Sequence, residues 1–245
     1  MIEHKKHVLI EKTITSNKEE LEHLIELAKE NDVVIMEAMR PAYDPGFFAI
    51  KSAMEKVAPV RRATFQYCQY SSRYDKFKNG IVENAFNPKF SNGSLTDIGV
   101  YCVHPMVKLF GMPDSIHAIA TVLPDSIDGQ GTIILTYKDM LAEVMYSKIT
   151  NSRLPSQIQG EKGAVIIEEI YNPRKVTIIY NDGTKESMDI PDCELNLNYE
   201  AEEWARLINL GRFTDEHVKY SLMSLEVMDE ARRQQQIVFP ADSLE

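Results

Sequence analysis

The 245-residue sequence lacks the features that mark several classes of protein. No apolar run approaches the ~20 residues needed to span a bilayer, and the N-terminus has no long apolar segment of a signal peptide. The three cysteines, Cys68, Cys102 and Cys193, are too widely spaced for a disulfide framework or a metal-binding pair. There is no basic run, and the net charge is −10. We therefore predict a cytoplasmic protein without a metal site and without nucleic-acid or membrane partners.

Another absence concerns glycine. The sequence contains no G-x-G-x-x-G, the turn whose backbone N–H groups hold the pyrophosphate of a dinucleotide at a helix start. The remaining composition, 44% hydrophobic and 26% charged, is that of an ordinary globular protein. The length suffices for one large domain, or for one domain and part of another.

The N-terminal segment reads as a strand, a helix and a second strand. Val8–Ile10 is a short apolar run, and apolar residues recur at helical spacing between Thr15 and Glu30. Val33–Met36 is a second apolar run of strand length. A βαβ unit of this size predicts two parallel strands joined by a right-handed crossover.

The next segment predicts a helix over residues 46–57, a strand over Val60–Tyr70, and a polar, irregular loop over residues 71–92. From Ser115 to Asp189, short strands separated by turns predict an antiparallel sheet. Helices are expected over Tyr199–Leu210 and His217–Gln236. The expected strands are Ile116–Val122, Gly131–Tyr137, Leu141–Ile149, Pro155–Gln159, Ala164–Ile167, Lys175–Tyr180 and Lys185–Ile190.

The stretch Asn92–His104 combines a turn, a helix start and polar groups on an otherwise apolar helix that ends near Gly111. A helix this apolar is buried, and its buried polar groups need partners. Asp97 and Tyr101 are four residues apart on one face, and His104 follows three residues later. Gly99 costs about 1 kcal/mol relative to alanine in a helix, which suggests that another group approaches the backbone closely.

These residues carry a family resemblance. Gly93–Tyr101 resembles the signature of the glucose–fructose oxidoreductase / inositol dehydrogenase / MocA family of NAD(P)-dependent dehydrogenases. His7–Lys12 is similar to the family strand that ends in Glu-Lys-Pro, with Thr13 in place of proline. The spacing between the two motifs, with Met36–Ala38 between them, most resembles the dihydrodiol and xylose dehydrogenase branch.

The resemblance implies an α/β plus α+β fold. Residues 1–40 would be the C-terminal remnant of a Rossmann domain, so about half of a dinucleotide-binding fold would be missing. Residues 41–197 would form a substrate and oligomerisation domain with an open, mainly antiparallel β-sheet covered by helices on one face. Residues 198–245 would supply helices that pack across both.

The resemblance also implies the chemistry. Lys12 and Tyr101 would be the catalytic pair, with the Lys12 ammonium lowering the pKa of Tyr101, whose reference value of ~10 is too high for a base at neutral pH. Asp97 would orient the substrate hydroxyl or hold Lys12, and His104 would bind substrate. Alternatively, Asp97 caps the helix and His104 is a hydrogen-bonded core residue.

Glu11, Lys12 and Arg40 would contact the NAD or NADP cofactor by the same resemblance. An arginine in a loop is more often solvated, and Glu11 could instead support Lys12.

The function that follows is an NAD(P)-dependent oxidoreductase acting on the CH–OH group of a sugar, polyol or related cyclic alcohol, with the 245-residue chain truncated and inactive. The alternative is a non-catalytic, oligomeric β-sheet module derived from such an enzyme. In both cases we expect a homodimer or higher homo-oligomer through the sheet, since its strands carry apolar residues on both faces.

Overall fold

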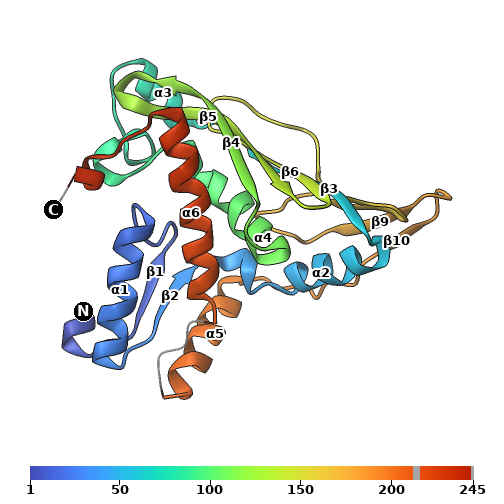
Figure 1. Cartoon of the computed structure of the whole chain (residues 1–245), viewed down its shortest axis with the longest axis horizontal. Helices are drawn as coiled ribbons and strands as arrows, with labels where there is room; N and C mark the ends of the chain where they lie inside the picture. The colour runs from blue at the N-terminus through green and yellow to red at the C-terminus, as the bar shows by residue number, and fades with distance from the viewer. Residues whose placement is uncertain (212–215, 244–245) are drawn as a thin grey trace.

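The computed structural model describes residues 1–211 and 216–243, which form a small parallel sheet and a large mixed sheet joined by helices (Figure 1). The small sheet pairs β1 (Val8–Glu11) with β2 (Ile35–Ala38). The large sheet has the order β10-β9-β8-β7-β3-β6-β5-β4. Its strands are β3 (Val60–Cys68), β4 (Ser115–Leu123), β5 (Ile127–Tyr137), β6 (Met140–Ser147), β7 (Ser156–Gly160), β8 (Gly163–Ile167), β9 (Val176–Tyr180) and β10 (Lys185–Ser187).

The N-terminal unit is built around α1 (Lys18–Asn31). The Asn17 side chain accepts a hydrogen bond of 2.9 Å from the Glu20 N–H and so caps the first turn. The helix buries Leu21, Ile25 and Ala28 in a core shared with the two parallel strands and with α6 (Val218–Gln235). The long C-terminal helix therefore ties this unit to the rest of the chain, as Figure 1 shows.

In the large sheet every strand pair is antiparallel except β3 with β6. One face packs against α2 (Pro45–Val57), α4 (Val100–Phe110) and α6 (Figure 1). The alternation in β5 shows this asymmetry, because Ile133 and Leu135 are buried while Ile134 between them is 46% exposed. The opposite face is open, and Ile119 of β4 on it is 75% exposed. The expected fold class is confirmed.

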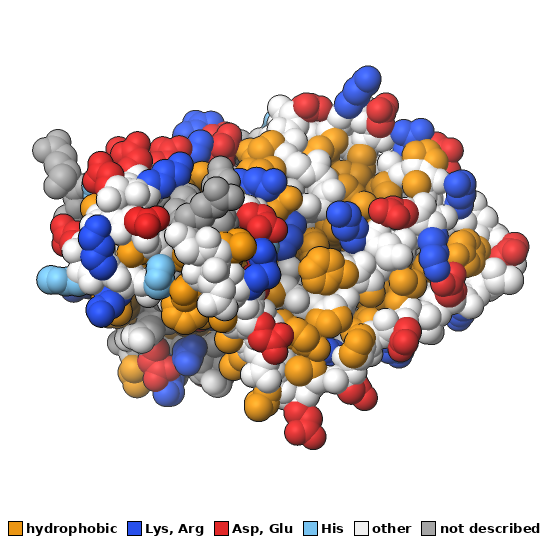
Figure 2. Space-filling view, turned by 90° about the horizontal axis from the view of Figure 1, so that it is seen from below, with side chains coloured by type: hydrophobic (Ala, Val, Ile, Leu, Met, Phe, Trp, Pro, Cys, Tyr) orange, Lys and Arg blue, Asp and Glu red, His pale blue; other side chains and the backbone are white. Residues whose placement is uncertain are grey.

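Apolar side chains also reach the surface on another side of the molecule. α2 and α5 (Leu197–Asn209) lie low in Figure 1. Seen from below, apolar side chains form a broad band bordered by charged ones (Figure 2). Phe48 of α2 and Leu197 of α5 are both more than half exposed. The open face of the sheet is thus not the molecule's only apolar surface.

The structure corrects the expectation of an irregular loop over residues 71–92. This segment holds α3 (Ser72–Lys78) and two single 3-10 turns, Asn84–Phe86 and Pro88–Phe90. Phe86 is fully buried and packs with Tyr74 and Phe77. A seven-residue helix held by aromatic contacts is too short for a hydrophobic period to be visible in the sequence.

Strand β5 begins at Ile127, four residues before the expected start at Gly131. Gly131 pairs with Ala120 and Tyr146 inside the ladder, so the strand continues through this glycine. Within residues 1–211 and 216–243, none of the helices combines the length and apolarity needed to cross a membrane. Residues 212–215 and 244–245 of the expected C-terminal segment lie outside the described part of the chain.

Candidate active site

A pocket of about 440 Å³ lies where the end of β1, the turn before α4, the start of α3 and the ends of β3 and β6 meet. The residues from Leu95 to Gly99 form one π-helical turn, in which the Val100 N–H bonds the Leu95 carbonyl. Such wide turns are rare and frequently occur at functional sites. The pocket is lined by Lys12, Tyr67, Gln69, Tyr70, Ser71, Ser72, Arg73, Asp97, Ile98, Tyr101 and Lys148.

At the centre of the pocket, one carboxylate binds two ammonium groups. Lys12 Nζ donates to the Asp97 carbonyl at 2.6 Å and to Asp97 Oδ1 at 3.1 Å. Lys148 Nζ donates to the other oxygen, Oδ2. The side chains of Lys12 and Lys148 are 12% and 5% exposed, whereas Asp97 is 27% exposed. Asp97 therefore presents one edge to the pocket while both of its oxygens are held.

The structure does not support the alternative in which Asp97 caps the helix, because the carboxylate of Asp128 caps it instead. Asp128 at the start of β5 is buried, and its Oδ2 accepts from the Leu95 N–H at 2.6 Å. A Cβ added at Gly93 would lie 1.9 Å from Asp128 Oδ1. Glycine at this position therefore lets the Asp128 carboxylate reach the start of the helix. Burial raises the pKa of Asp128 to about 7.

Tyr101 shares the pocket with Lys12. Lys12 Nζ lies 5.1 Å from the centre of the Tyr101 ring. Burial raises the pKa of Tyr101 to about 12, and the nearby charge that lowers this pKa is Arg40. The Lys12 ammonium is itself bonded to Asp97. In this state the pKa of Tyr101 is raised and its phenol is neutral at pH 7, so the role of Lys12 in activating Tyr101 stays a prediction.

The loop after Lys12 is fixed by two contacts. Thr13 Oγ1 donates to the Thr96 carbonyl at 2.9 Å, which joins the strand end to the π turn. The Ile14 N–H donates to Glu37 Oε1 at 3.1 Å, and Glu37 Oε2 accepts from Ser221 Oγ at 2.6 Å. Burial raises the pKa of Glu37. This carboxylate at the end of β2 therefore connects the Lys12 loop to α6.

Glu11 and Lys12 also line a second pocket of about 440 Å³, whose wall includes the loop after Lys12. Its wall includes Ser16, Ser91 and Asn92, which offer hydroxyl and amide groups. Burial lowers the pKa of Lys12, and the charge of Glu11 partly offsets this effect. Glu11 is exposed and does not hydrogen-bond Lys12 in the structure, so its expected contact with cofactor stays a prediction.

Arg40 lies close to the site, but protein groups occupy its guanidinium. Its Nη2 donates to the Tyr171 carbonyl at 2.7 Å and its Nη1 to Asn172 Oδ1 at 3.2 Å. The Tyr171 ring stacks on Tyr67 at 3.9 Å, and Tyr67 meets Tyr101 edge-on at 5.9 Å. Arg40 thus supports the aromatic wall of the pocket, and its contact with cofactor or substrate stays a prediction.

His104 does not line the pocket. It is 3% exposed, and its charged neighbours are Lys108 and His217. Burial lowers its pKa well below the usual value, so the imidazole is neutral. Three residues turn an α-helix by about 300°, so His104 is rotated about 60° away from Tyr101. The position of His104 fits the alternative of a core residue. Its Nδ1 has no hydrogen-bond partner within the described residues.

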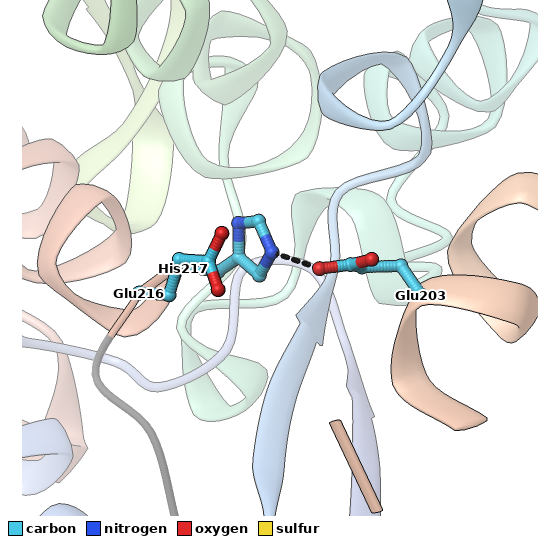
Figure 3. Close-up of side chains that lie close together, drawn as sticks. All are labelled: Glu203, Glu216 and His217. Atoms are coloured by element: carbon cyan, nitrogen blue, oxygen red, sulfur yellow. Dashed lines mark hydrogen bonds and ion pairs between the residues drawn. The ribbon is translucent and has the colours of Figure 1, made fainter. Parts of the chain in front are cut away.

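A separate cluster joins His217 with two carboxylates, drawn in Figure 3. Its potential ligand atoms lie within 4.8 Å of one another, and His217 Nε2 is 2.5 Å from Glu203 Oε1. Arg206 Nη2 also bonds both acids, at 2.7 Å to Glu203 and 3.0 Å to Glu216. The protein's own guanidinium therefore already supplies the positive charge that this carboxylate pair attracts.

Three residues of the site were not found from the sequence: Glu37, Asp128 and Lys148. Each is a charged residue at the end or the start of a strand whose neighbours are apolar. A charged residue within Met36-Glu37-Ala38, or shortly after Val144-Met145-Tyr146, could have indicated a site. A charged side chain beside buried strand residues must find a polar partner. The partners lie far away along the chain: 23 and 184 residues for Glu37 with Ile14 and Ser221, 33 residues for Asp128 with Leu95, and 51 residues for Lys148 with Asp97.

Comparison with known proteins decides the family. Residues 59–166 match the GFO/IDH/MocA C-terminal domain. The scyllo-inositol 2-dehydrogenase (NADP(+)) IolU of Bacillus subtilis (strain 168) is 48% identical over 241 residues, which is 98% of this chain and 74% of that protein. The chain belongs to the GFO/IDH/MocA family. This membership makes it an oxidoreductase by family, and the recognition of the two sequence motifs is confirmed.

Other members of the family match over nearly the whole chain. The trans-1,2-dihydrobenzene-1,2-diol dehydrogenase of Danio rerio is 27% identical over 258 residues, covering 98% of this chain and 73% of that protein. Among crystal structures, KijD10, a 3-ketoreductase from Actinomadura kijaniata in complex with NADP and TDP-benzene, superposes with a TM-score of 0.83. That match covers 96% of this chain and 72% of the other at 18% identity, which establishes the shared fold.

Proposed function

We propose that this chain carries the substrate-binding and proton-transfer side of an NADP-dependent dehydrogenase of cyclic polyols. The observation that carries the proposal is the meeting of Lys12, Asp97 and Tyr101 in one polar pocket of about 440 Å³. The 48% identity to a scyllo-inositol 2-dehydrogenase that uses NADP(+) supports both the substrate class and the cofactor.

Oxidation of a ring CH–OH group requires that a hydride leave the carbon and that a proton leave the oxygen, so that a C=O bond forms. NADP(+), when bound, accepts the hydride. Tyr101 takes the proton in this direction and returns it in the reduction of the ketone, for which its neutral hydroxyl is already in the right state. Lys12 lies over the Tyr101 ring, where its ammonium favours the phenolate that forms as the proton is taken. Asp97 accepts from a substrate hydroxyl.

The residues fit the nicotinamide end of the cofactor better than its phosphates. The second pocket beside Lys12 offers hydroxyl, amide and carboxylate groups. The sequence has no Gly-rich turn of the kind that binds pyrophosphate. We therefore propose that the 245-residue chain binds NADP weakly and is inactive as a dehydrogenase at micromolar cofactor.

Titration of the chain with scyllo-inositol, followed by isothermal calorimetry and by ligand-observed NMR, tests the proposal. Saturable binding is expected, weakened about tenfold in Asp97→Ala by loss of a charge-assisted hydrogen bond. Lys108→Met is the matched control, because Lys108 is a buried lysine outside the pocket whose Nζ bonds the Ala42 carbonyl at 2.6 Å. Absence of polyol binding would favour the non-catalytic module instead.

At millimolar NADP(+), the same polyol should be oxidised slowly, with NADPH appearing at 340 nm. No hydride transfer at any cofactor concentration, with polyol bound, would contradict the dehydrogenase proposal while leaving polyol recognition intact.

We also propose that the chain forms a two-fold homodimer through the open face of the large sheet. Ile119 and Ile134 stand exposed there on neighbouring strands. An uncovered apolar face of this kind is typical of a protein interface.

A further inference from the structure

Lys148 occupies a place whose backbone is fixed from two sides. It directly follows β6, its N–H donates to the Gly129 carbonyl at 2.9 Å, and its own carbonyl accepts from the Ser71 N–H at 2.9 Å. Ser71 caps α3, which forms one wall of the pocket. The lysine side chain therefore starts from a defined position where sheet, pocket wall and Asp97 come together.

The charge balance around Asp97 is unusual for a purely structural ion pair. One carboxylate would neutralise one ammonium, yet Asp97 binds both Lys12 and Lys148. Arg73 adds a further positive charge close to Lys148. A buried excess of positive charge opposes folding, so this arrangement is poorly explained as a stabilising contact.

We infer that Lys148 is a positioning residue, which holds Asp97 Oδ2 so that Oδ1 keeps the Lys12 ammonium beside Tyr101. The inference rests on the proposed function, because it assigns Lys148 a part in the same site. Without Lys148, Asp97 stays bonded to Lys12 but is free to move with it, and the ammonium loses its fixed place over the Tyr101 ring. A misplacement of about 1 Å at a reacting centre can cost on the order of 100-fold in rate.

The charges that face Lys148 come from three elements: Asp97 from the π turn, Lys12 from the end of β1 and Arg73 from α3. Burial, together with Arg73 and Lys12, lowers the pKa of Lys148 to about 8. Lys148 is therefore charged at pH 7 and loses its charge, and its strong contact with Asp97, as the pH rises past 8. Arginine at this position would keep the charge throughout.

The decisive measurement is the pKa of Lys12, followed by NMR of ¹⁵Nζ-labelled lysine in the full chain. In Lys148→Met the pKa of Lys12 should rise by about 0.5 or more, because a competing cation leaves the shared carboxylate. Lys108→Met removes another buried lysine and should leave the pKa of Lys12 unchanged. An unchanged Lys12 pKa in a folded Lys148→Met variant would overturn the inference.

Turnover at millimolar NADP(+) gives a second readout. Lys148→Met should lower kcat about 10- to 100-fold with little change in the KM for NADP(+). Lys148→Arg should recover much of the loss. Equal kcat in Lys148→Met and the parent would also overturn the inference. Since the Lys12 titration needs no turnover, a parent chain that oxidises no polyol counts against the proposed function alone.

Discussion

Replacement of Gly99 by alanine tests why glycine stands between Asp97 and Tyr101. The backbone of Gly99 is helical, with φ −60° and ψ −33°, so alanine suits it and should gain about 1 kcal/mol of helix propensity. An added Cβ, however, would lie 3.1 Å from Cγ of Tyr146 and 3.0 Å from Cδ1 of Leu95. The outcome depends on whether these neighbours can move.

Tyr146 is held on several sides. It is 1% exposed, and Gln235 Nε2 donates to its hydroxyl at 3.0 Å. A Cβ added at Gly131 would lie 2.3 Å from the same hydroxyl, which shows how closely β5 approaches it. Overpacking against a fixed neighbour costs about 1–3 kcal/mol. Most of this range exceeds the propensity gain, so we expect Gly99→Ala to lower the free energy of unfolding by up to about 2 kcal/mol.

Urea unfolding followed by circular dichroism measures this change, and the melting temperature should fall by about 2–4 °C for each kcal/mol. The matched background is Tyr146→Leu, which removes the ring. There, Gly99→Ala should be clearly less destabilising, since the contact with the ring is gone and only the contact with the end of the Leu95 side chain opposes the propensity gain. A Gly99→Ala variant more stable than the parent, or an equal loss in both backgrounds, would refute the packing argument.

Three further predictions concern the site and the surface. Tyr101→Phe should lower turnover at millimolar NADP(+) by about 10²–10⁴-fold with nearly unchanged cofactor affinity, because the hydroxyl acts where the proton moves; steady-state kinetics check this, and turnover within a factor of two of the parent removes Tyr101 from the mechanism. Calorimetric titration with NADP(H) and NAD(H) should show dissociation constants weaker than about 10 μM, a standard free energy near −7 kcal/mol; tighter saturable binding would mean that another arrangement holds the phosphates. Light scattering should give about twice the single-chain mass of 28.0 kDa; Ile119→Lys on the open sheet face should halve that mass, whereas Phe48→Lys on the α2 surface should leave it unchanged.

Some features of this protein could be predicted because they are local. The apolar period between Thr15 and Glu30 and the cap at Asn17 specify a helix through residues that are close together in the sequence. The alternation in the strands after Ser115 specifies a sheet with two distinct faces. The spacing of Asp97 and Tyr101 places both on one side of a helix, and the structure brings both into one pocket.

The polar network around Asp97 could not be predicted in the same way. Its Lys148 partner is 51 residues away along the chain, and the carboxylate that caps Leu95 is 33 residues away in Asp128. Neither pairing produces a periodic pattern in the sequence. Each depends on which strand ends of the large sheet lie beside the start of the helix. The sign of the Tyr101 pKa shift has the same origin, since burial raises this pKa by more than the charge of Arg40 lowers it.

The sequence by itself thus determined the family motifs and the helices and strands with a clear hydrophobic period. It also placed Asp97 and Tyr101 side by side, one helical turn apart. The tertiary structure alone decided that His104 faces Lys108 and His217 instead of the pocket. It also decided that Asp97 holds two lysines. The physical reason is range: capping and periodicity act within a few residues, whereas burial and charge pairing depend on segments that only the folded chain brings together.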